Sequence, residues 1–274
     1  MPEKYVHRDG LPLLVRHTGQ TTLPQDPPVR GSGPAIVCLH DAGLQGSVFK
    51  DLLTALEHEE GHASALAFDL PGHGRSGSLD SLPSVEAMTE TARWLADRCR
   101  FERPILVGHG MGALIALEWA RTAADEVAGL VLCGAGLALA ITDEAIETMR
   151  KVTRGKAPRP FDPSRVCPDS GPDLMRRAYM EGIQTDPRAT LVDLEASRAW
   201  SDHFDAGPSI GVATAIVCGS AEPEMCQERA RTIARSCSRA THRELQGAAH
   251  FLPLEKPQAL AAEILRLARP PEVA

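Results

Sequence analysis

The chain has 274 residues, of which 43% are hydrophobic and 24% are charged, so it can form one large domain or two small ones. Its formal net charge of -7 argues against unaided binding to nucleic acid or to an anionic membrane. The N-terminal residues lack the regions of a signal peptide, and no stretch has the roughly 18 apolar residues of a membrane span. We therefore expect a small molecule as the partner.

The seven cysteines are odd in number and include no Cys-x-x-Cys pair. Cys38, Cys133 and Cys218 each lie in an apolar run, where a free cysteine behaves as a small hydrophobic residue. This usage predicts reduced thiols and a cytoplasmic protein. The histidines and acidic residues show no metal-ligand spacing, so we expect neither a metal nor a cofactor.

Short apolar runs along the chain alternate with segments that have helical spacing. The predicted strands lie at 12–17, 35–39, 63–68, 104–107, 129–134, 213–218 and 240–245. The predicted helices lie at 47–58, 84–100, 111–120, 225–236 and 257–268. This alternation predicts an α/β fold with a mostly parallel sheet that helices cover on both faces.

Residues 137–209 interrupt this alternation, because they contain no strand run and their helix candidates are broken by prolines. We predict that they form a helical insertion over one edge of the sheet. The core domain then consists of residues 1–136 and 210–274.

Gly-His-Gly-Met-Gly at 108–112 lies between a predicted strand and a predicted helix. A strand, a tight glycine-rich turn and a helix are the setting of the nucleophile elbow, whose pattern is G-x-S-x-G. Gly110 occupies the position of the serine and has no side chain. The sequence therefore predicts a hydrolase site from which the nucleophilic oxygen is missing.

Four segments together resemble the α/β-hydrolase family, and the likeness covers almost the whole chain. They are Leu-His-Asp-Ala-Gly at 39–43, Asp-Leu-Pro-Gly-His-Gly-Arg-Ser at 69–76, the elbow at 108–112, and Gly-Ala-Ala-His-Phe-Leu-Pro-Leu-Glu-Lys-Pro at 247–257. The resemblance implies an eight-stranded sheet and identifies the insertion 137–209 with the helical cap, or lid, of the family.

The resemblance also implies the catalytic groups. Acyl transfer needs a nucleophile, a base and a carboxylate that orients the base. Position 110 is the nucleophile position, His250 matches the base, and Glu222 is the candidate acid, with Glu224 as its competitor. The sequence does not decide between the two glutamates.

The oxyanion hole of the resemblance uses two backbone N–H groups, which are those of Met111 and Ala42 in this chain. One departure concerns the residue that precedes Ala42. The family usually has His-Gly at 40–41, whereas this chain has His-Asp. A carboxylate at Asp41 opposes oxyanion chemistry unless it points away from the hole.

Residues of two regions are predicted to border the substrate. His109 and Phe251 belong to the elbow and the histidine loop, and Met180 and Trp200 belong to the cap. Met149, Met175, Tyr179 and Phe204 are further cap residues that either line the pocket or pack the core of the cap. Residues 148–177 hold eight Lys or Arg against three Asp. This excess either steers an anionic substrate or is a solvated face.

Three functions are compatible with these residues. The first is a Ser-His-acid carboxylic-ester hydrolase in which Gly110 is an inactivating substitution that traps an ester or lactone. The second is a naturally non-catalytic ligand-binding protein on the same fold. The third is a lyase, or a C–C or lactone-cleaving enzyme, in which His250 acts as the base without a covalent intermediate. The oligomeric state is left open.

Overall fold

The computed structural model describes residues 1–269 apart from residues 21, 25, 32, 59–62 and 203–209. Its described residues form an eight-stranded sheet with the order β1-β2-β4-β3-β5-β6-β7-β8. The pairs β1–β2 and β2–β4 are antiparallel, and the other pairs of this sheet are parallel. This confirms the predicted α/β fold with a mostly parallel sheet. The strands are β1 (Glu3–Arg8), β2 (Leu11–His17), β3 (Ala35–Leu39), β4 (Ser64–Phe68), β5 (Ile105–His109), β6 (Gly129–Cys133), β7 (Thr214–Gly219) and β8 (Ala240–Leu245).

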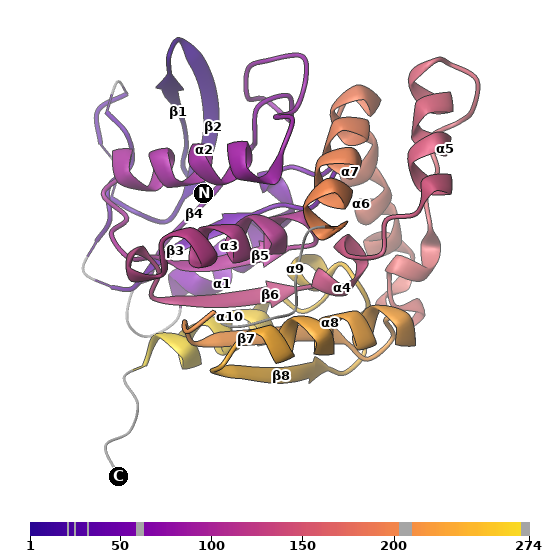
Figure 1. The fold of residues 1–274 in the computed structure, drawn as a ribbon. Coiled ribbons are helices and arrows are strands. Elements are labelled where there is room, and N and C mark those ends of the chain that lie inside the picture. The colour runs from indigo at the N-terminus through magenta and orange to yellow at the C-terminus, as the bar shows by residue number, and fades with distance from the viewer. Residues whose placement is uncertain (21, 25, 32, 59–62, 203–209, 270–274) are drawn as a thin grey trace.

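Helices cover both faces of this sheet (Figure 1). The helices α2 (Val85–Arg98), α3 (Met111–Thr122) and α8 (Glu224–Ser236) pack on one face and share one hydrophobic cluster. The helices α1 (Lys50–His58) and α10 (Pro257–Ala268) pack on the other face with the second cluster. The central strands are buried from end to end, which explains why they appear in the sequence as continuous apolar runs.

Strand β1 was missed by the prediction. Its sequence, Glu-Lys-Tyr-Val-His-Arg, has only Val6 fully buried, because this strand forms an edge of the sheet. An edge strand of this kind carries little apolar signal. Backbone pairing with β2, and not an apolar pattern, fixes the position of β1 in the sheet.

The segment between β6 and β7 contains helices and short turns in its described part. They are α4 (Ala135–Ala138), α5 (Asp143–Thr153), η3 (Pro163–Arg165), η4 (Pro168–Ser170), α6 (Gly171–Ile183) and α7 (Pro187–Asp202). Helices α5 to α7 stand beyond the carboxyl ends of β6 and β8 in Figure 1. Residues 203–209, including Phe204 of the predicted pocket lining, lie outside the described residues. We refer to the described part, residues 135–202, as the cap.

No helix in the described part of the chain is both long and apolar enough to cross a membrane. All seven cysteines are buried and free.

Candidate active site

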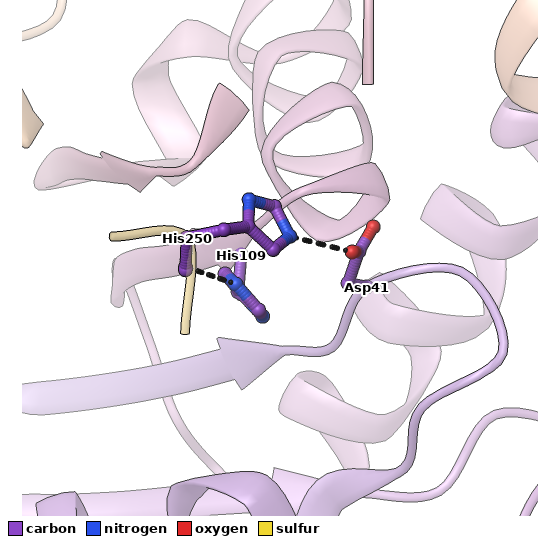
Figure 2. A group of neighbouring side chains, drawn as sticks. All are labelled: Asp41, His109 and His250. Atoms are coloured by element: carbon purple, nitrogen blue, oxygen red, sulfur yellow. Dashed lines mark hydrogen bonds and ion pairs between the residues drawn. The ribbon is translucent and has the colours of Figure 1, made fainter. Parts of the chain in front are cut away.

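The loops after β3, β5, β7 and β8 bring the predicted catalytic residues together at the carboxyl edge of the sheet. The loop after β3 carries Asp41, the turn after β5 carries Gly110, and the loop after β8 carries His250. In Figure 2 the imidazole of His250 points at the carboxylate of Asp41, while His109 lies beside it. The group that faces His250 is therefore a carboxylate from another loop.

Gly110 and Asp41 fit each other sterically. Gly110 has a φ of 53°, in the left-handed region that glycine adopts readily. A Cβ atom built on Gly110 would lie 2.0 Å from Oδ1 of Asp41 and 2.1 Å from its Cγ. The absence of a side chain at 110 thus leaves the volume that the Asp41 carboxylate fills, and a serine at 110 would require Asp41 to move.

One oxygen of Asp41 occupies the predicted oxyanion hole. Its Oδ1 accepts hydrogen bonds from the backbone N–H groups of Met111 and Ala42, both at 2.8 Å. These are the two donors predicted for the hole, and they converge on a single atom. The carboxylate of Asp41 does not point away from the hole but enters it, which is the arrangement that opposes oxyanion chemistry on a substrate.

The other oxygen of Asp41 faces two cationic or polar side chains. Its Oδ2 lies 2.9 Å from Nε2 of His250 and 2.7 Å from a guanidinium nitrogen of Arg165. Burial by itself would raise the pKa of Asp41, but the hydrogen bond from His250 and the charge of Arg165 outweigh it and hold that pKa well below its usual range. Asp41 is therefore ionised at neutral pH.

The ionised state of Asp41 fixes the tautomer of His250. An ionised carboxylate can only accept, so Nε2 of His250 carries a hydrogen and donates it to Oδ2. Burial, followed by the charge of Arg165, lowers the pKa of His250 to about 3, so the ring is neutral. Its Nδ1 has no hydrogen-bond partner. This is the reverse of the tautomer in a serine triad, where Nδ1 carries the hydrogen.

Glu222 lies on the Nδ1 side of His250, with Oε1 at 3.9 Å from Nδ1. Burial, assisted by the charge of Glu255, raises the pKa of Glu222 to about 8, so its carboxyl group is protonated at neutral pH. Glu224 begins α8 and pairs with Arg231 in solvent. The structure thus places Glu222, and not its competitor Glu224, beside the histidine.

The cap reaches into this site through Arg165, for which the sequence offers no signal beyond its place in the basic run 148–177. The backbone N–H of His250 donates to the carbonyl of Arg165 at 3.0 Å. The guanidinium also lies over the ring of Phe251, 5.2 Å from its centroid. The cap therefore supplies a cation to the site and fixes the histidine loop.

The cavity above the site has a volume of about 470 Å³. Its wall includes Asp41, Met111 and Phe251 from the core. Arg159, Arg165 and several apolar cap side chains complete it, among them Ile141, Met149, Phe161, Tyr179 and Leu194. A pocket of this size and lining suits a small, mostly apolar molecule with a few polar groups.

Only one of the four residues predicted to border the substrate lines this cavity, namely Phe251. His109 is fully buried, and its Nε2 contacts the carbonyl of His250 at 2.9 Å. Trp200 is buried and donates through Nε1 to Glu118. Met180 is 45% exposed on the surface of α6. Helical spacing gave no information about which side of each cap helix faces the core.

The ligand atoms of Asp41, His109 and His250 lie within 4.8 Å of one another, which is a set that can hold a divalent cation. The guanidinium of Arg165 already supplies positive charge to Asp41 at 2.7 Å. A metal ion would have to displace this arginine and the hydrogen bond from His250. The donors therefore fit a metal poorly in this arrangement.

A sequence profile of the α/β-hydrolase family matches residues 36–263. The chain belongs to this family.

Among curated proteins, the chain is 35% identical over 112 residues to a pimeloyl-[acyl-carrier protein] methyl ester esterase of Methylococcus capsulatus, covering 38% of each chain. It is also 35% identical over 105 residues to a putative non-heme haloperoxidase of Mycobacterium phage D29, covering 38% of this chain and 37% of the relative. The matched segment thus spans less than half of these relatives. Their activities do not transfer directly.

Two solved structures share the fold over nearly the full chain. The enol-lactonase from Burkholderia xenovorans LB400 has a TM-score of 0.73 at 21% identity, covering 96% of this chain and 98% of its own. A thermophilic esterase from Thermogutta terrifontis has a TM-score of 0.77 at 19% identity, covering 98% of this chain and 100% of its own. At these identities the likeness concerns the fold.

Proposed function

We propose that this chain is a small-molecule hydrolase in which the carboxylate of Asp41 replaces the missing hydroxyl as the nucleophile. His250 and Glu222 move the protons, and the backbone N–H groups of Met111 and Ala42 serve the second half of the reaction. Gly110 is then part of the natural design, because it provides the space for Asp41.

One observation carries this proposal. The two N–H donors at Met111 and Ala42 are already bound to Oδ1 of Asp41. Donors that hold this atom stabilise charge that develops on Asp41 itself, and they are not available to a substrate carbonyl. Such charge develops on Oδ1 when Asp41 has become an ester and water attacks its carboxyl carbon.

In the first step, Oδ2 attacks a saturated substrate carbon and forms an ester bond, while the bond from that carbon to its leaving group breaks. The leaving group departs with the electron pair; an epoxide oxygen takes the proton from Nε2 of His250, whereas a bromide leaves as the anion and that proton passes to solvent. Glu222 gives its proton to Nδ1 as the 3.9 Å gap closes, so the histidine stays neutral and Glu222 becomes ionised. Arg165 loses its anionic partner on Asp41 and can turn to the leaving group.

In the second step, water attacks Cγ of the Asp41 ester and Nε2 of His250 takes its proton. The negative charge appears on Oδ1, between the N–H groups of Met111 and Ala42. Collapse of this intermediate breaks the bond between Cγ and Oδ2, so Oδ2 leaves as the oxygen of the product alcohol and takes the proton from Nε2, while the oxygen from water stays on the carboxyl group of Asp41. The remaining proton returns through His250 to Glu222, which restores the starting state.

The prediction of a serine ester hydrolase inactivated at position 110 has less support. It requires that a Ser side chain and Asp41 occupy the same volume, since the Cβ position of residue 110 lies 2.0 Å from Oδ1. Attack on an ester carbonyl would also need donors that Asp41 already uses. A saturated carbon that bears a halide or an epoxide oxygen needs no such donors.

A second candidate is a ligand-binding protein without turnover. The ion pair between Asp41 and Arg165 favours it, because a carboxylate held by a guanidinium at 2.7 Å is less nucleophilic than a free one. The cavity would then bind its ligand above a fully satisfied site.

Intact-mass spectrometry distinguishes these candidates. The wild type and a His250→Gln variant are incubated with styrene oxide, hexyl bromide and bromohexanoate. We expect the variant to accumulate the alkyl group of a bromide on Asp41, because bromide leaves without a proton from His250 and water is no longer activated, and Asp41→Asn to prevent it. With styrene oxide, whose oxygen needs that proton, the variant should form less adduct. Asp162→Asn is the matched control, since Asp162 also lines the cavity but only caps the turn at Ser164. Absence of any adduct in the His250→Gln variant, or formation of the same adduct in Asp41→Asn, would contradict the proposal.

A further inference from the structure

Arg159 lies in the cap, after α5, and is one of the residues that line the cavity, as is Thr190, the acceptor of its guanidinium. One of its terminal nitrogens donates to the carbonyl of Thr185, and the other donates to Oγ1 of Thr190 at 2.8 Å. Both acceptors are neutral. The guanidinium is thus held in place at the cavity wall without neutralisation of its charge.

The other arginine of the cavity wall behaves differently, because Arg165 is paired with Asp41. Cap arginines outside the cavity are also paired, as Arg150 is with Glu195 and Arg188 is with Asp186. Among the described residues, no carboxylate lies within ion-pair distance of Arg159. Burial lowers the pKa of Arg159, opposed by the charge of Asp186, which shows that this cation is partly desolvated without a direct counter-ion.

Arg159 is also close to the reacting loop. Thr190, which accepts its hydrogen bond, packs against Gly43, where a Cβ atom would lie 2.7 Å from both Cγ2 and Oγ1 of Thr190. Gly43 follows Asp41 and Ala42 in the same loop. A ligand group bound at Arg159 therefore belongs to a molecule that shares the cavity with Asp41.

We propose that Arg159 binds the carboxylate of a small organic acid, whose carbon chain lies along the apolar wall of the cavity. This inference rests on the proposed function only in taking the cavity as the substrate site. A guanidinium presents several N–H donors in a plane that matches a carboxylate. A single negative charge is favoured over a doubly charged phosphate, because the same wall includes Asp41, Glu144 and Asp162.

Isothermal titration calorimetry with matched anionic and neutral probes tests the proposal. Butanoate, hexanoate and octanoate are compared with hexanamide, which has the shape of hexanoate without its charge. We expect the wild type to bind at least one of the acids and to prefer hexanoate to hexanamide. Arg159→Gln should weaken hexanoate roughly tenfold or more and leave hexanamide unchanged, because a charged hydrogen-bond pair is lost. Arg159→Lys should show an intermediate loss and guards against misfolding of the Gln variant.

Arg176→Gln is the matched control, since Arg176 carries the same charge on an exposed position of α6 outside the cavity wall. It should leave both affinities unchanged. Equal loss in Arg159→Gln and Arg176→Gln, equal binding of hexanoate and hexanamide, or no binding of any acid would overturn the inference. Because calorimetry needs no turnover, hexanoate binding that survives in Asp41→Asn separates this inference from the proposed reaction. Inorganic phosphate is the remaining probe, and tighter binding of phosphate than of the acids would contradict the carboxylate assignment.

Discussion

Two buried carboxylates lie between core and cap, and each contacts an imidazole. Asp41, from the core, contacts His250 and Arg165 and borders the cavity. Asp193, from the cap helix α7, contacts His73 at 2.8 Å and is fully buried away from the cavity.

The environments of the two carboxylates separate their roles. Asp193 also accepts from Ser81 Oγ at 2.5 Å and from the backbone N–H of Gly43 at 2.8 Å, so its oxygens are saturated by fixed donors. The oxygens of Asp41 also have donors, but Asp41 lines the cavity, and one of its donors is the side chain of Arg165, which lines the same cavity. A carboxylate–imidazole pair can therefore border a cavity or be enclosed in the interior, according to what surrounds it.

The largest expected effect comes from breaking the structural pair. Asp193→Ala leaves His73, whose pKa Asp193 raises against the effect of burial, without its partner. We expect a loss of about 3–5 kcal/mol in the free energy of unfolding. Urea denaturation measures this value, and Ser81→Ala, which removes one donor only, should cost less. A loss below that of Ser81→Ala would show that Asp193 does not join the cap to the core.

The candidate site carries a pH dependence of stability through Glu222. Its pKa is raised from 4.5 to about 8 in the folded protein, so the folded state holds a proton that the unfolded state releases. The free energy of unfolding should fall as pH rises from 4.5 to 8, by at most a few kcal/mol. Below 4.5 the group is protonated in both states and has no effect.

Glu222→Gln should abolish this part of the decline, because glutamine is neutral at every pH. The difference between the two denaturation profiles isolates Glu222 from His73, whose raised pKa also makes stability fall with rising pH. Parallel profiles for the variant and the wild type would mean that Glu222 titrates normally.

Gly110→Ser tests the steric fit between Asp41 and position 110. We expect it to lose about 1–3 kcal/mol of stability, because the backbone is left-handed and the Cβ meets Asp41. It should remain inactive towards short p-nitrophenyl esters. The double variant Asp41→Gly with Gly110→Ser empties the oxyanion hole and should recover part of the stability.

The ester assay on the double variant also distinguishes a natural pairing of Asp41 with Gly110 from a serine esterase inactivated at position 110. Esterase activity in the double variant but not in Gly110→Ser would support the view that Asp41 and Gly110 form a natural pair. Activity in Gly110→Ser alone would instead support the inactivated serine esterase.

The smallest effect concerns Trp200, which was predicted to border the substrate. In the structure it donates to the buried carboxylate of Glu118 at 3.0 Å. Trp200→Phe should cost about 1 kcal/mol in thermal denaturation, because one buried hydrogen bond is lost. The affinity for hexanoate should not change. A clear change in this affinity would show that Trp200 contributes to ligand binding.

Much of the fold was predictable from local sequence. Each central strand is a continuous apolar run that is buried on both faces, and each covering helix shows its own periodicity, as at Val85, Met88, Ala92 and Leu95. The position of His250 followed from its loop, since it comes after β8 at the carboxyl edge. Edge strand β1 was missed because its single buried residue gives no pattern.

Within the site, the sequence determined that the nucleophilic hydroxyl is missing at 110 and that Asp41 departs from the family pattern. It did not show that the two departures compensate each other. That depends on the rotamer of Asp41, whose Oδ1 lies 2.0 Å from where a Cβ atom of residue 110 would be. Tertiary structure alone brings Arg165 to Asp41, across 124 residues of chain, and buries Glu222 so that it keeps its proton. Local patterns predict elements because the spacing of apolar side chains follows the periodicity of a helix or the burial of a strand, whereas charge and protonation depend on what the folded chain packs around each group.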